Sequence, residues 1–276
     1  MVIKVYKPTT PGRRGMTSVT EFGISKKIKP LKKLTKGRKE SAGRSKGRIS
    51  IWHRGGGHKR KLRLVDFKQD KLDIEGKVVR IEYDPGRSAY LAQIVYTDGE
   101  KRYVLAWQGI KIGEKILTSK NKIEIKPGNR MPLSYLQSGT FIHNIALTKE
   151  GSGKIVRGAG TAATLMGIEN KMVQIKLPSS EIRLVSEEAM ATIGEISKKE
   201  HKIINIGKAG RQRWMGIRPT VRGKAMSVDS HPHGGGEGRN PIGLKYPKTP
   251  WGKHALGVKT RKRHKPSSKF IIKRRG

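Results

Sequence analysis

The positive charge of this chain is concentrated in two basic segments, while the stretch between them has the charge balance of an ordinary folded domain. Residues 26–63 hold 16 Lys and Arg against one acidic residue, and residues 201–276 hold 20 against two. Residues 64–200 hold 21 basic and 17 acidic residues. Because a large excess of one charge destabilises a compact chain by self-repulsion, only this middle part is expected to build a core by itself.

The formal net charge of +40 predicts a polyanionic partner. Nucleic acid fits, because each phosphate that Lys or Arg neutralises releases a counterion. A basic protein on a membrane surface needs an amphipathic helix, and no such pattern is present. A transmembrane helix needs about 18 apolar residues in a row, and no such run occurs. The start MVIKVYKPTT is not signal-peptide-like and the chain has no cysteine. We therefore expect a soluble intracellular protein without disulfides or thiolate metal sites.

The middle of the chain is predicted to be β-structure. Period-2 runs rich in β-branched and aromatic residues predict strands at 77–83, 90–97, 100–107, 110–116, 122–126, 139–148, 153–158, 171–177, 181–185 and 191–196. Asp98-Gly99 is typical of a type I′ hairpin turn. Residues 161–167 indicate at most one helical turn. Many short strands predict two small barrels divided near Pro127-Gly128-Asn129, with a single larger barrel as the alternative.

The basic ends are predicted to be extensions without a core of their own. Residues 26–60 and 207–276 have few apolar residues and no sustained period, so alone in water they bury too little apolar surface to offset their ordering entropy. Isolated Trp and Met residues and specific Gly-rich turns favour extensions that become ordered against a charged partner. Flexible tails are the alternative.

Two glycine triplets, HRGGGHKR (53–60) and HPHGGGEGR (231–239), predict close contact with a nucleic-acid backbone. Glycine lets the backbone approach a phosphate closely, and successive N–H groups in such turns can bind an anion. Arg54, Lys59, Arg60 and Arg239 flank the triplets and supply charge. Neither triplet fits the phosphate-loop or dinucleotide-binding pattern, so nucleotide hydrolysis and dinucleotide binding are unsupported.

The stretch SHPHGGGEGR (230–239) allows a metal site, an acid–base pair or a nucleic-acid loop. Zinc needs three or four ligands, and the other histidines show no paired spacing with His231 and His233. Asp229 is near His231 in sequence, but no enzyme scaffold surrounds the pair. We predict no catalytic residue, no metal site and no cofactor, and leave open Mg²⁺ shared with phosphates. The histidine is interpreted as a hydrogen-bonding tip.

The run AGRQRWMGIRPTVRG (209–223) places four arginines around Trp214. Arginine pairs bidentately with phosphate and stacks on bases, and tryptophan offers a stacking face. The alternative is a hydrophobic anchor, in which Trp214 and Met215 pack back on the barrels. The segment 260–276 is a generic basic tail, whose cations neutralise phosphates or stay solvated.

Nine stretches, in order along the whole length, resemble the bacterial form of the universal large-subunit ribosomal protein two family. They are KPTTPGRRGMTS (7–18), SAGRSKGRI (41–49), HRGGGHKRKLRLVDFK (53–68), IEYDPGRSAYLA (81–92), YTDGEKRYVLAW (96–107), PGNRMPLSYLQSGTFIHNIAL (127–147), INIGKAGRQRWMGIRPTVRGKAM (204–226), HPHGGGEGR (231–239) and TPWGKHALGVKTRKRHK (249–265). The length and specificity of these stretches make chance similarity implausible.

The resemblance implies an all-β chain of four parts. These are a basic N-terminal extension (1–60), an OB-like barrel (61–124), an SH3-like barrel (125–200) and a basic Gly/Arg-rich C-terminal extension (201–276). It implies a non-enzymatic, primary rRNA-binding constituent of the large ribosomal subunit that supports subunit association and tRNA placement near the peptidyl-transferase region. The implied partners are large-subunit rRNA, the small subunit, tRNA indirectly and neighbouring ribosomal proteins. The implied location is cytoplasmic and ribosome-bound, in a bacterium or an organelle of bacterial descent.

The motifs and the resemblance together give the expected rRNA contacts. They are Arg44, Arg48, His53, Arg54, Gly55, Gly56, Gly57, His58, Lys59, Arg60, Lys208, Arg211, Arg213, Trp214, Arg218, Arg222, His231, His233, Gly234, Gly235, Gly236, Arg239, Lys253, Arg261, Lys262 and Arg263. An RNA-processing or RNA-modifying enzyme and a sequence-independent packaging protein remain as alternatives.

The sequence departs from the family pattern at three places. Where the family usually reads Asn-Pro-x-Asp before His-Pro-His, this chain has Ser227, Val228, Asp229 and Ser230 in order. The aspartate thus lies one place further from His231, which lowers the case for an Asp–His pair. Trp52 and Trp107 stand where the family more often has Arg and Pro.

Overall fold

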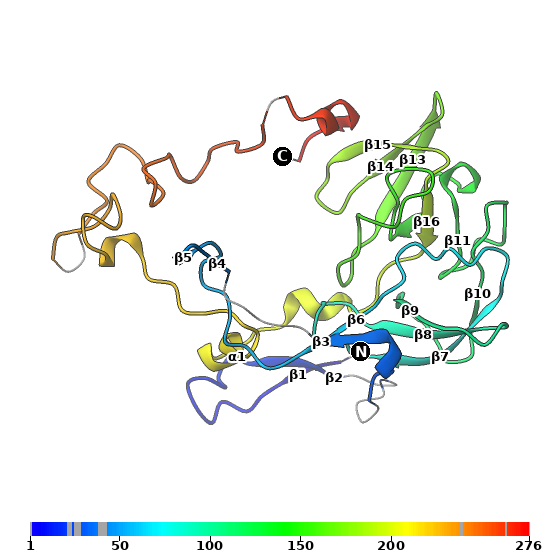
Figure 1. Ribbon diagram of the computed structural model, residues 1–276, viewed down its shortest axis with the longest axis horizontal. Coiled ribbons are helices and arrows are strands. Elements are labelled where there is room, and N and C mark those ends of the chain that lie inside the picture. Colours follow the sequence, from blue (N-terminus) through cyan, green and yellow to red (C-terminus); the bar gives the residue numbers. More distant parts are fainter. Residues whose placement is uncertain are drawn as a thin grey trace. The chain divides into compact units, whose positions relative to one another are not determined.

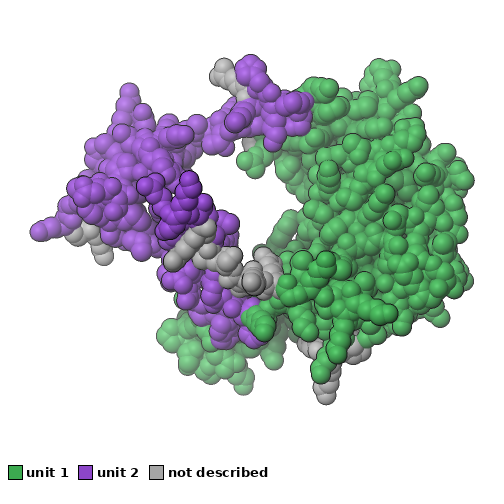
Figure 2. Space-filling model, viewed as in Figure 1, with its two compact units in different colours: residues 1–39, 59–209, 269–276 green, residues 40–58, 210–268 purple. Residues whose placement is uncertain are grey.

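The computed structural model describes residues 2–20, 24, 29–37, 43–237, 240–262 and 264–275, and for Val2 and Arg44 the backbone alone. The chain divides into two compact units (Figure 2). The first unit comprises residues 1–39, 59–209 and 269–276, and the second unit comprises residues 40–58 and 210–268. Among the expected contacts, Arg239, Arg263 and the side chain of Arg44 lie outside the described part.

Four antiparallel strands form one sheet of the first unit, in the order β10-β7-β8-β9 (Figure 1). They are β7 (Gly76–Glu82), β8 (Leu91–Tyr96), β9 (Lys101–Leu105) and β10 (Lys115–Ile116). The inward side chains Val78, Ile94 and Val104 pack in one apolar cluster, as the period-2 alternation predicts. Leu91 and Leu105 belong to a second cluster that includes Ile196. The central strand β8 is therefore buried on both faces.

The β8–β9 turn differs from the predicted type I′ turn. Gly99 has φ +83°, but Asp98 is not among the described non-glycine residues with positive φ. The Gly99 N–H donates to the Tyr96 carbonyl at 2.9 Å, and the Tyr96 N–H donates to the Glu100 carbonyl at 3.0 Å. This pattern is a three-residue loop, in which a type I turn precedes a left-handed glycine. Only Gly99 of this turn adopts positive φ, so Asp98 avoids the steric cost that a side chain has in the left-handed region.

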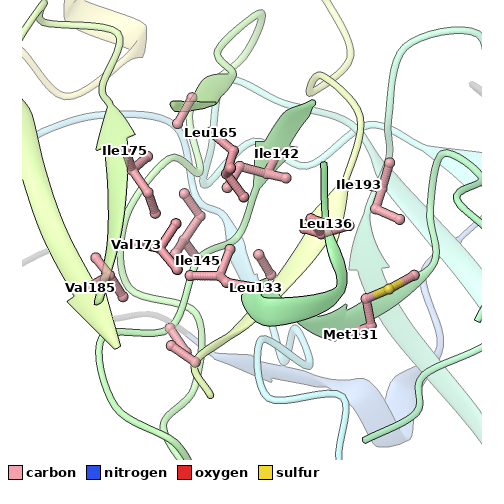
Figure 3. Close-up of a cluster of buried hydrophobic side chains, with 14 residues drawn as sticks. Met131, Leu133, Leu136, Ile142, Ile145, Leu165, Val173, Ile175, Val185 and Ile193 are labelled. Carbon is pink, nitrogen blue, oxygen red and sulfur yellow. The ribbon is translucent and has the colours of Figure 1, made fainter. Parts of the chain in front are cut away.

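Seven antiparallel strands form the second sheet of this unit, in the order β11-β16-β12-β13-β14-β15-β17. They are β11 (Arg130–Pro132), β12 (Phe141–His143), β13 (Ala163–Glu169), β14 (Met172–Lys176), β15 (Ile182–Ser186), β16 (Met190–Ile193) and β17 (Ile271–Lys273). Ile142, Leu165 and Ile175 point toward one another in a core of 14 buried residues (Figure 3).

The two separate sheets and the scarcity of helix confirm the predicted all-β class with an OB-like and an SH3-like barrel. The alternative of one larger barrel is wrong. None of the helices in the described ranges is long and apolar enough to cross a membrane.

Several predicted strands are shorter than their patterns or absent. The run 139–148 yields only β12, because the chain leaves extended geometry at Asn144, whose φ is +48°. The run 110–116 yields only β10. Residues 122–126 form no strand, and 153–158 contribute only a bridge between Ile155 and Ile145. Residues 161–167 enter β13 and not a helical turn, because antiparallel pairing with β14 decides their conformation.

The extensions contain more local structure than their composition predicts. The strands are β1 (Val2–Val5) with β2 (Thr17–Thr20), β3 (Thr35–Gly37) with β6 (Lys61–Arg63), and β4 (Arg44–Ser45) with β5 (Arg48–Ile49). The α-helix is α1 (Ala209–Trp214), and 3₁₀ turns lie at Lys32–Leu34, Lys199–Ile203, Gly223–Ala225 and Pro266–Phe270. One further 3₁₀ turn, Leu133–Tyr135, lies outside the extensions, between β11 and β12. The elements of the extensions are short, since local turns and pairings form without a hydrophobic core.

Trp107 lies where the two sheets of the first unit meet. Its side chain is buried, and its backbone forms an antiparallel bridge with Ile196. The next residue, Gln108, donates its N–H to the Glu195 carbonyl at 2.8 Å. Gly128, just before β11, faces the indole ring. Trp107, which follows β9 of the four-stranded sheet, therefore contacts the segments that flank β11 and β16 of the seven-stranded sheet.

Two buried cation-forming side chains lie side by side in the SH3-like barrel. Arg130 donates Nη1 to the Asn144 carbonyl at 2.7 Å and to the Thr192 hydroxyl at 3.1 Å. The His143 ring makes a 2.8 Å hydrogen bond to the Gly194 carbonyl, so Nδ1 carries the proton. Burial lowers the pKa of His143 to about 4, and Arg130 adds to the shift. The ring is therefore neutral in the folded chain near pH 6.

We expect the free energy of unfolding to fall by roughly 3 kcal/mol through His143 as the pH drops from about 6.5 to about 4. With its pKa lowered on folding, His143 binds its proton more tightly in the unfolded chain. The stabilisation that the neutral His143 ring contributes is thus complete at a pH above the pKa of His143 in the unfolded chain. It is lost as the pH falls toward the pKa of the folded chain. Urea unfolding across this range measures it. The His143→Asn variant keeps an N–H donor without a titrating ring, and an equal pH-dependent loss in that variant would contradict the assignment.

Candidate nucleic-acid interface

The first glycine triplet and the Arg/Trp run come together in the second unit. Arg54 forms an antiparallel bridge with Ile217. The Gly55 N–H donates to the Gly216 carbonyl at 2.9 Å, and the Arg218 N–H donates to the His53 carbonyl at 3.0 Å. Two motifs that are more than 150 residues apart in sequence thus build one backbone-paired site.

Guanidinium groups line this paired site. A Cβ placed on Gly56 would lie 3.9 Å from Arg213 Nη2 and 4.0 Å from Arg218 Nη1, so the absent side chain leaves the turn open beside two arginines. The Nη1 atom of Arg213 is buried and has no hydrogen-bond partner among the described atoms. A buried donor of this kind normally has an acceptor. A phosphate at this site would therefore accept hydrogen bonds from these donors and neutralise their positive charge.

The helix α1 presents the remaining side chains of the Arg/Trp run. Arg211 and Arg213 lie in its last turn, where cations interact favourably with the helix dipole. Trp214 is 59% exposed, and its carbonyl accepts the His58 N–H at 2.9 Å. The backbone of Trp214 thus anchors the triplet, while the residue as a whole stays more than half exposed.

The second triplet is organised by its two histidines. His231 is buried, and its Nδ1 accepts the His233 backbone N–H at 3.0 Å. The Nε2 of His233 accepts the Lys248 backbone N–H at 2.8 Å. An imidazole nitrogen that accepts cannot carry the proton, so the neutral tautomers are Nε2–H in His231 and Nδ1–H in His233. Each ring then has only a donor left for a further partner.

The charge environment of His233 agrees with a neutral ring at that residue. Desolvation lowers the pKa of His233 most, and unfavourable electrostatic interactions with the neighbouring His231, Lys248 and Lys224 side chains lower it further. The structure shows no Asp229–His231 pair, and the Asp229 carboxylate accepts a 3.4 Å hydrogen bond from the Ser227 hydroxyl. An imidazole acts as a general base through a free lone pair, and in this arrangement both lone pairs are engaged.

Gly234 allows the loop to close on itself. A Cβ at this residue would lie 2.2 Å from the Ser227 carbonyl oxygen, which no side chain tolerates. Gly235 and Gly236 follow with φ of +83° and +81°. The Gly235 N–H donates to the Met226 carbonyl at 3.1 Å. The triplet is therefore required by the tight return of the chain as well as by any ligand.

The structure separates the other expected contacts. Lys59, Arg60 and Lys208 belong to the first unit, where Arg60 donates Nη1 to the Pro85 carbonyl at 3.1 Å. In the second unit, Arg261 donates to the hydroxyls of Ser267 and Ser268. Among the expected contacts in that unit, the exposed cations are Arg48, Arg54, Arg218, Arg222, Lys253, Arg261 and Lys262.

Two arrangements of cations and aromatic rings in the first unit were not predicted. Two arginines lie over the Phe67 ring, Arg157 at 4.4 Å and Arg87 at 5.2 Å from its centroid. Lys198 lies 4.7 Å from the centroid of Tyr90 and 5.1 Å from that of Tyr83. These contacts join residues far apart in sequence, so no local pattern indicates them.

A further feature of the second unit has a sequence signal that was missed. Residues 247–255 form a small hairpin, in which Thr249 and Lys253 pair and Trp251 lies at the tip. Pro250 and Gly252, on either side of the tryptophan, are typical turn residues. The described residues contain no group of three or more His, Asp or Glu side chains placed to hold a metal ion.

Two family models match the chain. The model described as "Ribosomal Proteins L2, RNA binding N-terminal domain" matches residues 31–118, and so includes the four-stranded sheet. The model described as "Ribosomal Proteins L2, C-terminal domain" matches residues 126–252, from just before β11 to the tip of the hairpin. Together the two matches cover more than half of the 276 residues. The chain therefore belongs to the ribosomal protein L2 family, and it has a structural, rRNA-binding role in the ribosome.

Proposed function

We propose that this chain is a primary rRNA-binding component of the large ribosomal subunit, in which the second unit delivers cations and Gly-rich turns to rRNA phosphates. One observation carries the proposal. The second unit holds 18 Lys and Arg against three acidic residues, and none of its described hydrophobic side chains is buried. A unit with this charge and no core needs a polyanion to offset its ordering entropy and self-repulsion.

In this proposal, the charged side chains and the folded sheets have different roles in rRNA binding. Arg211, Arg213 and Arg218 neutralise phosphates beside the first triplet, while the sheets of the first unit serve as a rigid platform. The loop 231–239 approaches the peptidyl-transferase region, and the chain supports subunit association and tRNA placement there. Mg²⁺ shared between rRNA phosphates and the loops belongs to this proposal, with no dedicated protein site.

The loop acts without chemistry of its own in this proposal. The partly exposed His233 ring offers its N–H donor to an RNA acceptor, and the engaged lone pairs of both imidazoles argue against proton abstraction. An RNA-processing or RNA-modifying enzyme would turn over RNA as the isolated protein and would lose that activity in His231→Ala. A packaging protein would bind unrelated nucleic acids as tightly as rRNA at equal salt.

The decisive experiment is sedimentation of the tagged full chain from lysate through a sucrose gradient, with and without a wash in about 0.5 M salt. Exposed charge pairs are strongly screened at this ionic strength. We expect the chain to remain at the large-subunit peak, because cations inside RNA are held by many desolvated contacts. Loss to the top fractions after the wash would identify a peripheral polyanion binder and overturn the proposal.

A further inference from the structure

Trp251 lies at the tip of the backbone-paired hairpin 247–255 in the second unit. The Thr249 N–H donates to the Lys253 carbonyl at 2.7 Å, and the Ala255 N–H donates to the Pro247 carbonyl at 2.8 Å. Gly252 follows the tryptophan with φ +74°, which closes the turn. Lys248, at the base of this hairpin, is the residue whose N–H binds His233. The position of Trp251 is therefore fixed by backbone hydrogen bonds.

Trp52 supports one side of the Trp251 ring. The two ring centroids lie 6.0 Å apart at an interplanar angle of 56°. Trp52 is held by a 3.2 Å hydrogen bond from its Nε1 to the Ile49 carbonyl and by an edge contact with His53. Trp251 remains 72% exposed and Trp52 41% exposed. Most of Trp251 thus remains open, although burying its indole surface would be favourable.

The charge around the pair favours a nucleic acid as the ligand of this surface. Neither residues 43–58 nor residues 240–268, which carry the two rings, contain a single Asp or Glu. Lys248 and Lys253 lie in the hairpin itself, and Arg54 follows two residues after Trp52. An exposed indole among cations without carboxylates is the combination that binds unpaired nucleotides, since the ring stacks on a base while the cations hold its phosphates.

We propose that the Trp52–Trp251 pair is a stacking site for an unpaired rRNA base, with Trp251 as the platform and Trp52 as the residue that positions it. The inference rests on the rRNA-binding function proposed above. It assigns a contact of a different kind from the arginine contacts. Stacking on a base neutralises no phosphate, so its loss weakens binding without changing the number of counterions released.

The test measures binding of the full chain to a transcript of large-subunit rRNA at several KCl concentrations. We expect Trp251→Ala to weaken binding about tenfold at every concentration, with the slope of log K against log salt unchanged. Trp251→Phe should restore most of the affinity, because it retains a ring. Leu256→Ala is the matched control, since Leu256 is 79% exposed in the same segment but has no ring.

Tryptophan fluorescence gives a second readout. In a Trp214→Phe background, which keeps the pair and the buried Trp107, RNA should quench the emission and Trp251→Phe should remove most of that quenching. Wild-type affinity in Trp251→Ala would overturn the stacking site while the rRNA-binding function stands. A reduced salt slope in that variant would also overturn it, because it would mean that Trp251 only positions cations. Failure of the wild-type chain to bind the transcript would overturn both proposals.

Discussion

Replacing Arg211, Arg213 and Arg218 together by alanine is expected to lower the affinity for large-subunit rRNA roughly 100-fold at 0.1 M salt. Each lost phosphate contact removes about 0.7 to 0.9 from the slope of log K against log salt, so three contacts reduce the slope by roughly two to three. The structure places Arg213 and Arg218 at the backbone-paired site of the first triplet, and Arg211 lies in the helix α1 that precedes Arg218. Filter binding at four or more salt concentrations measures affinity and slope together.

A second triple variant separates these contacts from the effect of net charge. Lys115, Lys126 and Lys149 are exposed in the first unit, and each is ion-paired with a glutamate. Their replacement by alanine removes the same three charges. We expect a much smaller loss of affinity, because these cations already have carboxylate partners. Equal losses in both variants would show that overall charge, and not the site, determines binding. An unchanged salt slope in the arginine variant would remove those residues from the phosphate contacts.

The fold followed from the sequence where the signal was local. Alternation of apolar residues predicted β7, β8, β14 and β15 to within two residues, since a strand with a buried face repeats every second position. The same rule failed at 122–126, where apolar residues alternate but no strand forms. A strand forms only when a second strand pairs with it, and the alternation within a segment does not indicate whether such a partner is present.

The candidate site was predicted in its parts but not in its assembly. Glycine triplets and clustered arginines were visible as motifs, yet the bridge between Arg54 and Ile217 joins segments that no local periodicity connects. The role of His231 as an internal acceptor was likewise hidden, because a tautomer depends on which N–H lies within reach. The expected domain boundaries and individual RNA contacts stay predictions, which the binding experiments address residue by residue.

The junction at Trp107 provides the second large effect, on stability. A Cβ on Gly128 would lie 2.6 to 2.8 Å from three carbon atoms of the Trp107 ring, and Gly128 has φ +96°. The Gly128→Ala change therefore combines a left-handed backbone, which costs about 1–2 kcal/mol, with overpacking of a buried contact, which costs about 1–3 kcal/mol. We expect urea unfolding to show a loss of roughly 3 kcal/mol or more.

Gly139→Ala is the matched control for this prediction. Gly139 has φ +86°, close to that of Gly128, but no atom lies within 4 Å of the position its Cβ would take. This variant should lose only the backbone cost, about 1–2 kcal/mol. The difference between the two variants then measures the contact with Trp107. Trp107→Leu should reduce that difference in a double-mutant cycle, because a smaller side chain leaves room for the new methyl group. If Gly128→Ala and Gly139→Ala were equally destabilised, the indole would not be packed on Gly128, and the junction would be held by its backbone contacts, the Trp107–Ile196 bridge and the Gln108–Glu195 hydrogen bond.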